Sequence, residues 1–177
     1  MAWLDAPISG GAPAALTGSM AIMVGGSEED FKRAQPIWDA LAGRCTLMGG
    51  IGAGQTTKMI NQLLVACGFV IVAEACNLAE RAGVEASSIS QALEGGRADS
   101  RLLQEYMPKM ATSDFSLTGP IGNMLKDLEM IHDLARATNA ALPITSIVTE
   151  LFRKLVADGL SRQDNSEVVR LYRSAEK

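Results

Sequence analysis

The hydrophobic pattern of the chain changes near residue 50. Before that point, apolar runs of strand length occur at Met20–Val24, which two glycines end, and at Cys45–Met48. Ile8 follows a proline that disfavours helix at the residue before it, so another short extended segment is predicted there. The first part of the chain is therefore expected to hold a few short strands.

One helix is predicted between these strands. It begins at Ser27, whose hydroxyl can cap it, and three acidic residues follow in the first turn, where the helix dipole favours them. Pro36 lies inside this helix and is expected to bend it. Apolar positions at helical spacing predict that one face is buried: Phe31, Ala34, Ile37, Trp38 and Leu41.

Beyond residue 50 the pattern is helical to the end of the chain. A long helix is predicted from about Gly54 to Ala82, ended by Gly83. Its uninterrupted apolar run, Leu63–Ala73, is too short to span a bilayer and is expected to be buried. Shorter helices are predicted to begin at Ser87 or Ser88, at Ser100, at Pro120 or Ile121, at Pro143 and near Ser166.

Two of these shorter helices carry apolar stripes. The first stripe consists of Met124, Leu125, Leu128, Ile131 and Leu134, and the second of Ile144, Ile147, Val148, Leu151 and Leu155. The helix that begins at Ser100 is expected to stop before Pro108. The predicted fold is therefore mainly α.

Composition indicates a compact soluble protein. The chain has 177 residues, 47% of them hydrophobic and 20% charged, which suffices to bury the core of one domain or slightly more. Its net charge of -4 does not indicate a basic surface that would bind nucleic acid or an anionic membrane. The first residues lack a signal-peptide pattern. Cys45, Cys67 and Cys76 favour reduced core thiols in a cytoplasmic protein. Because His132 is the only histidine and no CxxC pair occurs, no metal site is expected.

Candidate chemistry gathers at the start of the long helix, after the glycine-rich loop 49–54. Asn61 and Gln62 follow Lys58 by three and four residues, so the three side chains lie on one helical face. An ammonium and two amides offer several donors and acceptors to a small oxygen-rich molecule. A lysine taken alone would be read as an ordinary solvated side chain, and only the surrounding sequence changes that interpretation.

Four segments of that surrounding sequence occur in a recognisable order. They are DAPISGG from residue 5, MAIMVGGSEEDF from residue 20, GAGQTTKMINQ from residue 52 and MLKDLEMI from residue 124. In this order and spacing the chain resembles the β-hydroxyacid dehydrogenases, the family of 3-hydroxyisobutyrate dehydrogenase, tartronate semialdehyde reductase and, more distantly, 6-phosphogluconate dehydrogenase. The resemblance covers residues 4–173 but only the later part of such an enzyme.

The resemblance implies two domains. Residues 1–50 would be the terminal strands and helix of an incomplete Rossmann nucleotide-binding domain. Residues 51–177 would be an all-helical substrate-binding and dimerisation domain with a long central helix, like the C-terminal domain of 6-phosphogluconate dehydrogenase. The Rossmann fingerprint G-x-G-x-x-G does not occur in this sequence, so most of the cofactor domain is expected to be missing. Dinucleotide binding by this chain alone is expected to be weak or absent, and the chain alone inactive.

The resemblance also implies roles for the residues around Lys58. A lysine at this position is the family's general acid/base, and burial against an apolar helix would lower its pKa toward neutrality. Ser9, Gly10 and Gly11 match the clamp for the substrate carboxylate, where glycines let the backbone approach and N–H groups face the anion. The family commonly has asparagine at the positions of both Asn61 and Gln62. Gln62 departs from that pattern, so which amide contacts the substrate stays open.

Three further residues are expected near the cofactor. Lys126 matches a later family lysine that reaches the nicotinamide and substrate, and Asp127 is expected to fix its position. Phe115 corresponds to an aromatic residue upstream of that lysine and either lines the cleft or packs. The implied reaction uses NAD or NADP to interconvert a small 3-hydroxy or 2-hydroxy acid with its semialdehyde or keto acid. The implied assembly is a dimer or tetramer formed through the helical domain, with no nucleic-acid or membrane partner.

Two other functions are alternative interpretations of the same residues. Gly49–Gly54 nearly matches the phosphate-binding G-x-x-x-x-G-K-[ST] motif of nucleotide hydrolases, but Gln55 stands where the motif needs lysine. A dimerisation module without catalytic activity could keep the same helical fold, although retained Ser9, Lys58 and Lys126 argue against it. ATP hydrolysis by the chain would identify the first alternative.

Overall fold

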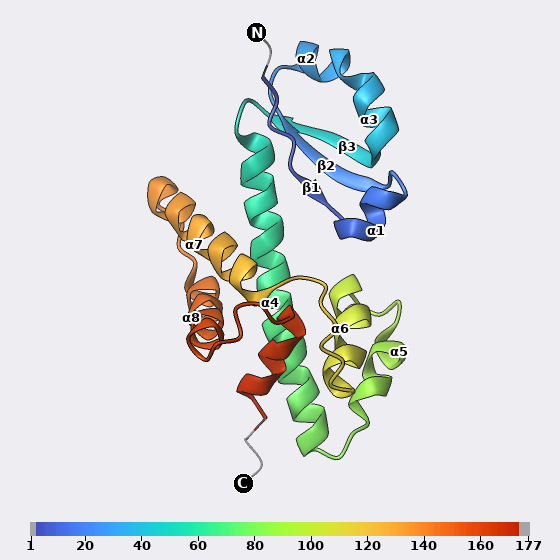
Figure 1. The fold of residues 1–177 in the computed structure, drawn as a ribbon, viewed down its shortest axis with the longest axis vertical. Coiled ribbons are helices and arrows are strands. Elements are labelled where there is room, and N and C mark those ends of the chain that lie inside the picture. The colour runs from blue at the N-terminus through green and yellow to red at the C-terminus, as the bar shows by residue number, and fades with distance from the viewer. Residues whose placement is uncertain (1–2, 174–177) are drawn as a thin grey trace. The chain divides into compact units, whose positions relative to one another are not determined.

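A computed structural model describes residues 3–173, except for the side chains of residues 12 and 13. The chain forms two compact units, Met1–Asn61 and Gln62–Lys177 (Figure 1). The long helix α4, Ala53–Arg81, begins in the first unit and continues into the second. Helices make up most of the structure, as the sequence predicts.

The first unit contains a three-stranded sheet in the order β1-β2-β3. The central strand β2 pairs antiparallel with β1 and parallel with β3. The strands are β1, Ile8–Ser9; β2, Met20–Gly25; and β3, Ala42–Gly49. All three predicted extended segments are therefore confirmed. The helices of this unit are α1, Gly11–Leu16; α2, Glu28–Arg33; and α3, Gln35–Leu41.

The helix predicted after Ser27 is two helices, α2 and α3. Ser27 caps α2 as expected, because its hydroxyl accepts a hydrogen bond from the Asp30 N–H at 3.1 Å. Ala34 ends α2, and Pro36 lies in the first turn of α3, where a proline needs no N–H donor. The prediction of one bent helix was wrong because the proline begins a new helix instead.

The core of the first unit lies between β2 and α3. Met20, Ile22 and Val24 alternate along β2 and are buried with Trp38. The Trp38 indole N–H donates to the Phe31 carbonyl at 3.0 Å, so the polar nitrogen of this buried side chain has a hydrogen-bond partner. The predicted stripe was wrong at its edge, because 54% of Ile37 and 44% of Leu41 are exposed.

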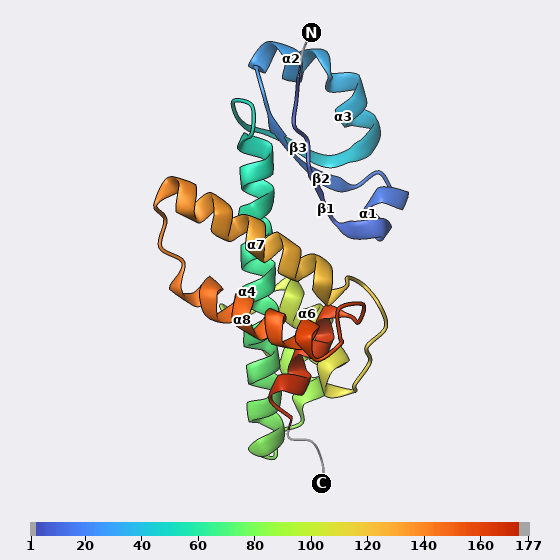
Figure 2. The same cartoon turned by 60° about the vertical axis from the view of Figure 1, so that its left-hand side comes forward.

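The second unit consists of helices around the later part of α4. Figure 1 shows α7 and α8 on one side of α4 and α5 and α6 on the other, and in Figure 2 α7 again lies beside α8. The elements after α4 are η1, Ala86–Ser88; α5, Ile89–Leu93; α6, Arg101–Ala111; α7, Ile121–Thr138; α8, Pro143–Ala157; and η2, Asn165–Leu171.

Most helix boundaries agree with the sequence signals. Ser100 caps α6, accepting from the Leu103 N–H at 3.0 Å, and Gly83 follows α4 with a left-handed φ of 73°. Two details differ. Glu85 rather than a serine caps η1 with its side chain, and Pro108 lies inside α6 instead of ending it.

The buried stripe of α7 is confirmed at its centre, where Met124, Leu128 and Ile131 are buried. On α8 the prediction failed for Ile144 and Ile147, each 65% exposed. The face that α8 buries instead carries Thr145, Val148, Thr149, Phe152 and Leu155.

The apolar surface of α4 is only partly buried. Leu64, Ile71 and Leu78 are 64%, 61% and 69% exposed, and their spacing of seven residues places them on one face. Among the described residues, α4 is one helix that by length and composition could cross a membrane, with 33% of its most apolar window buried. The run Leu63–Ala73 was expected to be buried and too short to span a bilayer, but the helix that contains it is long enough to do so. Its burial is confirmed only for residues such as Ala66, Phe69 and Ala73.

Candidate functional site

The turn that leads into α4 is held by the carboxylate of Asp5. Its Oδ1 accepts a hydrogen bond from the Gly52 N–H at 2.6 Å, and its Oδ2 accepts one from the Gln55 N–H at 2.9 Å. The backbone of Asp5 also pairs with that of Gly25 in both directions, at 3.0 and 2.8 Å. Burial would raise the pKa of Asp5, but the N–H donors, Gly52 first, outweigh it and lower the pKa below its usual value.

Two glycines, one in β2 and one at the start of α4, are explained by this carboxylate. An ideal Cβ on Gly54 would come 2.7 Å from Asp5 Oδ2 and would overlap the carbonyl oxygen of Met23. A Cβ on Gly25 would overlap the same carboxylate, 2.8 Å from its Oδ2. The first turn of α4 can therefore lie directly against β2 only because both positions lack a side chain.

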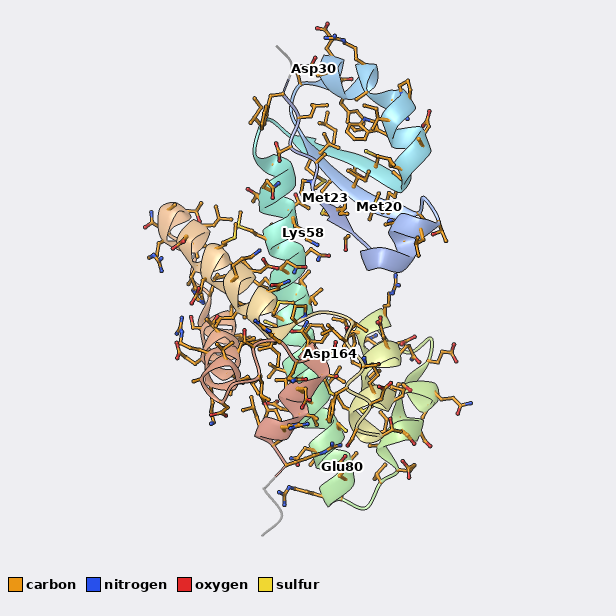
Figure 3. All side chains as sticks on the ribbon, in the orientation of Figure 1. Met20, Met23, Asp30, Lys58, Glu80 and Asp164 are labelled. Carbon is orange, nitrogen blue, oxygen red and sulfur yellow. The ribbon has the colours of Figure 1, made fainter. Side chains whose placement is uncertain are left out.

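Lys58 lies in the second turn of α4, and its side chain is half-buried (Figure 3). It follows Gly54 by four residues, so it projects from the same side of the helix that packs on β2. Asn61, three residues further on, is also half-buried. Both residues belong to the unit Met1–Asn61, which also contains the predicted carboxylate clamp.

The predicted clamp forms a turn that only glycine adopts readily. Ser9 ends β1, where it pairs with Ala21 of β2, and Gly10 precedes α1. Gly10 and Gly11 have φ angles of 123° and 64°, both in the left-handed region. A Cβ on Gly10 would also lie 2.5 Å from Ala14 Cβ. Ser9 and Gly10 are half-buried, and Gly11 is exposed.

In the second unit, Gln62, Asp127 and Lys126 form a connected polar chain. The Gln62 amide nitrogen donates to Asp127 Oδ2 at 2.6 Å, and Lys126 Nζ lies 3.1 Å from Asp127 Oδ1. The Lys126 side chain is 66% exposed, whereas that of Asp127 is 23% exposed. Asp127 therefore joins a residue of α4 to the lysine next to it on α7.

Phe115 lies in the loop between α6 and α7 and is half-buried. The guanidinium of Arg170 lies 5.0 Å from the centre of its ring, a cation–π arrangement. The ring is thus in contact with η2 through Arg170.

Asp164, which no pattern in the sequence singles out, is the centre of a buried network (Figure 3). One carboxylate oxygen accepts from the Thr118 N–H and hydroxyl and from the Gly119 N–H, and the other accepts from the Ser166 N–H and hydroxyl. Lys109 Nζ lies 3.5 Å away. Burial raises the pKa of Asp164, but the hydrogen bonds from Ser166 and Thr118 prevail and lower it to about 2.

This network fixes the beginning of α7. The Ile121 N–H donates to the Gln163 carbonyl at 2.9 Å, and the Gly122 N–H donates to the Ser161 carbonyl at 2.8 Å. A Cβ on Gly122 would come 3.1 Å from that same Ser161 carbonyl oxygen. The helix that carries Lys126 and Asp127 is therefore anchored one turn before them.

A groove of about 500 Å³ lies between α7 and α8, and none of the site residues predicted from the sequence is among those that line it. At one wall, His132 Nε2 lies 2.9 Å from the Thr149 hydroxyl, which itself donates to the Thr145 carbonyl at 2.7 Å. The imidazole Nε2 is therefore the donor in this pair. Within residues 3–173, no three histidine, cysteine or acidic side chains are grouped so that they could hold a metal ion. The groove is lined by Glu129, His132, Asp133, Arg136, Ser146, Thr149, Glu150 and Arg153.

Two families have sequence models that match the chain. The NAD-binding region of NADP-dependent 3-hydroxyisobutyrate dehydrogenase matches residues 52–172. The NAD-binding domain of 6-phosphogluconate dehydrogenase matches residues 1–50. The junction between the two matches falls in the glycine-rich loop before α4.

Known proteins are similar to the chain over most of its length. The 2-hydroxy-3-oxopropionate reductase of Escherichia coli K12 is 40% identical over 94% of this chain and 57% of its own length. The L-threonate dehydrogenase of the same strain is 32% identical, covering 96% of this chain and 56% of its own length.

Solved structures share the fold. A 3-hydroxyisobutyrate dehydrogenase from Salmonella typhimurium superposes with a TM-score of 0.87 at 32% identity, over 96% of this chain and 60% of that one. The 3-hydroxyisobutyrate dehydrogenase of Mycobacterium tuberculosis, solved with L-serine, gives 0.87 at 32% identity, over 97% and 61%. The chain therefore spans less than two thirds of the length of the relatives it matches.

Proposed function

The chain belongs to the β-hydroxyacid dehydrogenase family, and we propose that it is the substrate-binding and catalytic-lysine part of an NAD(P)-dependent oxidoreductase. The proposed reaction interconverts a small 3-hydroxy or 2-hydroxy acid and its semialdehyde or keto acid. The observation that carries the proposal is the position of Lys58, half-buried on the side of α4 that packs on β2.

Lys58 is the proposed general acid/base. During reduction its ammonium donates a proton to the carbonyl oxygen as that oxygen gains negative charge, and during oxidation the neutral amine takes the hydroxyl proton. Before the proton moves, the positive charge stabilises the developing alkoxide, and partial exclusion from water strengthens that attraction. The half-buried position suits both roles, since a fully solvated ammonium would be screened.

The proposed anchor for the substrate carboxylate is the turn Ser9–Gly11. Left-handed glycines such as Gly10 and Gly11 can turn backbone N–H groups toward an anion, and the Ser9 hydroxyl would add a further donor. Holding the carboxylate would fix which carbon of the substrate faces the nicotinamide. Asn61 and Gln62 are proposed as amide contacts to the substrate, and Gln62 also donates to Asp127.

The cofactor named in both family descriptions is a nicotinamide dinucleotide, which supplies or accepts hydride when bound. Lys126 fits a cofactor contact, because two thirds of its side chain is exposed while Asp127 holds its ammonium. Asp127 would hold Lys126 in place through that ion pair. Phe115, in the loop before α7, would line the cleft near the cofactor. We propose that residues 1–50 are the last part of a Rossmann domain and 51–177 the helical substrate domain. Because the sequence has no G-x-G-x-x-G loop, this chain alone would hold the dinucleotide weakly and turn over poorly.

Self-association through α4 is part of the proposal. The exposed stripe of Leu64, Ile71 and Leu78 runs along one face of the helix, and exposed apolar surface of this extent is typical of an interface. A dimer or tetramer would cover it. We propose a soluble, cytoplasmic enzyme, since an oligomer interface accounts for the apolar face of α4 without a membrane.

The test is turnover of small semialdehydes with NADH or NADPH. The chain would be compared with a fusion that adds to it the part of the E. coli 2-hydroxy-3-oxopropionate reductase that it does not cover. The expected result is strong activity in the fusion and little in the chain alone. A folded fusion that binds dinucleotide and stays inactive on all such substrates would favour the dimerisation module, and ATP hydrolysis would favour the nucleotide hydrolase.

A further inference from the structure

Asp5 contacts the first turn of α4 within the first unit, one helical turn before Lys58. The Asp5 carboxylate holds the N–H groups of two residues in the turn that starts α4. Gly54, between those residues, lies against the Met23 carbonyl of β2 and against Asp5 itself. Lys58 follows Gly54 by one helical turn on the same side.

This contact fixes the rotation of the helix about its own axis. A rotation of about 10° would move an atom at the outer radius of a helix, about 6 Å from the axis, by about 1 Å. Misplacement of a catalytic group by about 1 Å can cost about a hundredfold in rate. Because no Cβ separates Gly54 from β2, the turn has little room to rotate while both carboxylate hydrogen bonds persist.

A carboxylate is also chemically suited to accept hydrogen bonds from the N–H groups at the start of α4. The first N–H groups of an α-helix lack partners within the helix, and a carboxylate satisfies two of them while meeting the positive end of the dipole. An amide in its place could accept only with its oxygen, and its NH₂ group would face a donor. Asp5 lies 47 and 50 residues before its two partners, so it joins the N-terminal segment to α4.

We propose that Asp5 is a positioning residue for Lys58: its carboxylate sets the rotation of the first turns of α4 and thereby the direction of the lysine side chain. The effect on rate rests on the proposed function of Lys58, whereas the effect on the placement of Lys58 does not.

The test compares Asp5→Asn and Asp5→Ser with Asp30→Asn. Asp30 is a suitable control because it also lies at a helix start in the first unit, where its bonds are to Ser27, the cap of α2, and to Arg33 of the same helix. Competitive amine labelling followed by mass spectrometry would give the rate for each lysine in the folded protein. The expected result is a change of about threefold or more at Lys58 in the Asp5 variants, with Lys32, Lys126 and Lys154 unchanged, and no change in Asp30→Asn.

The active fusion supplies a second readout. In the Asp5 variants kcat would fall about tenfold while KM for the dinucleotide stays within about twofold, and Asp30→Asn would leave both unchanged. An unchanged labelling rate at Lys58 in a folded Asp5 variant overturns the proposal. So does loss of the fold in both Asp5 variants while Asp30→Asn folds, because Asp5 would then hold the whole unit. Activity that survives loss of Lys58 would refute the catalytic assignment but leave the labelling result standing.

Discussion

Asp164 accepts hydrogen bonds from both the backbone N–H and the hydroxyl of Thr118, at 2.6 and 2.7 Å, across 46 residues of chain. Asp164 is buried, so its charge depends on these donors and on the others around it. The pair connects the start of α7 to the segment before η2. It makes the second unit sensitive to the protonation of one carboxylate.

The first prediction concerns acid stability. Because the folded pKa of Asp164 is lowered from 3.8 to about 2, its contribution to stability is fully present above pH 4 and is lost as the pH falls toward 2. The shift corresponds to about 2 kcal/mol of unfolding free energy. Urea unfolding at pH 6 and pH 2.5 should show this loss in the wild type and a smaller pH dependence in Asp164→Asn.

Asp133→Asn is the control for that measurement, since Asp133 lies on the exposed side of α7. It should keep the wild-type pH dependence. An equal acid loss in Asp164→Asn and the wild type would mean that the hydrogen bonds to Asp164 do not stabilise its charged form.

The second prediction concerns the glycine-rich loop. Gly54→Ala should lower the free energy of unfolding of the first unit by about 1–3 kcal/mol, because its Cβ would overlap the Met23 carbonyl. Gly50→Ala is the matched control from the same loop, since a Cβ there meets nothing within 4 Å. It should change stability by less than about 0.5 kcal/mol. Equal effects in urea unfolding would show that the approach of α4 to β2 is not tight.

The third prediction concerns thiol reactivity. Burial, followed by the charge of Glu80, raises the pKa of Cys76 to about 11, so its thiolate is scarce at neutral pH. Iodoacetamide at pH 7.5 should therefore modify partly exposed Cys67 before Cys76. Mass spectrometry of native and urea-unfolded protein should show Cys76 modified only after unfolding. Fast modification of native Cys76 would contradict its buried position.

The fourth prediction concerns assembly. Leu64→Glu with Leu78→Glu should convert the proposed oligomer to a monomer in sedimentation experiments, because two buried unpaired carboxylates would oppose the interface. Ile147→Glu on α8 is the control, since Ile147 is as exposed as Leu64 but lies on a different helix. A wild-type protein that sediments as a monomer at tens of micromolar would remove the basis for this proposal.

Local signals in the sequence predicted much of the fold. Ser27, Ser100, Gly83 and Pro143 mark helix ends because capping, left-handed glycine and proline act within one turn. Periodicity also identified β2 and α4. It could not tell which apolar faces would be covered, so Ile144 and Ile147 were expected to be buried and are exposed. Coverage depends on neighbours that the pattern of one helix does not reveal.

The hydrogen-bond partners of Asp5 and Asp164 could not be predicted from the sequence. Asp5 and Asp164 each act on backbone N–H groups more than forty residues away, and no spacing rule connects such positions. Lys58 could be selected only because the segments around it resemble a known family. Neither Asp5 nor Asp164 has sequence neighbours that set it apart from the other acidic residues of the chain.

The most direct test of the account is the rate of the active fusion after Lys58→Ala, compared with Lys154→Ala, which removes an exposed lysine paired with Asp158 on α8. Loss of a general acid/base should lower kcat by about a hundredfold or more, with dinucleotide affinity unchanged and Lys154→Ala fully active. A Lys58→Ala enzyme that stays within a few-fold of the wild-type rate would contradict the catalytic role of Lys58.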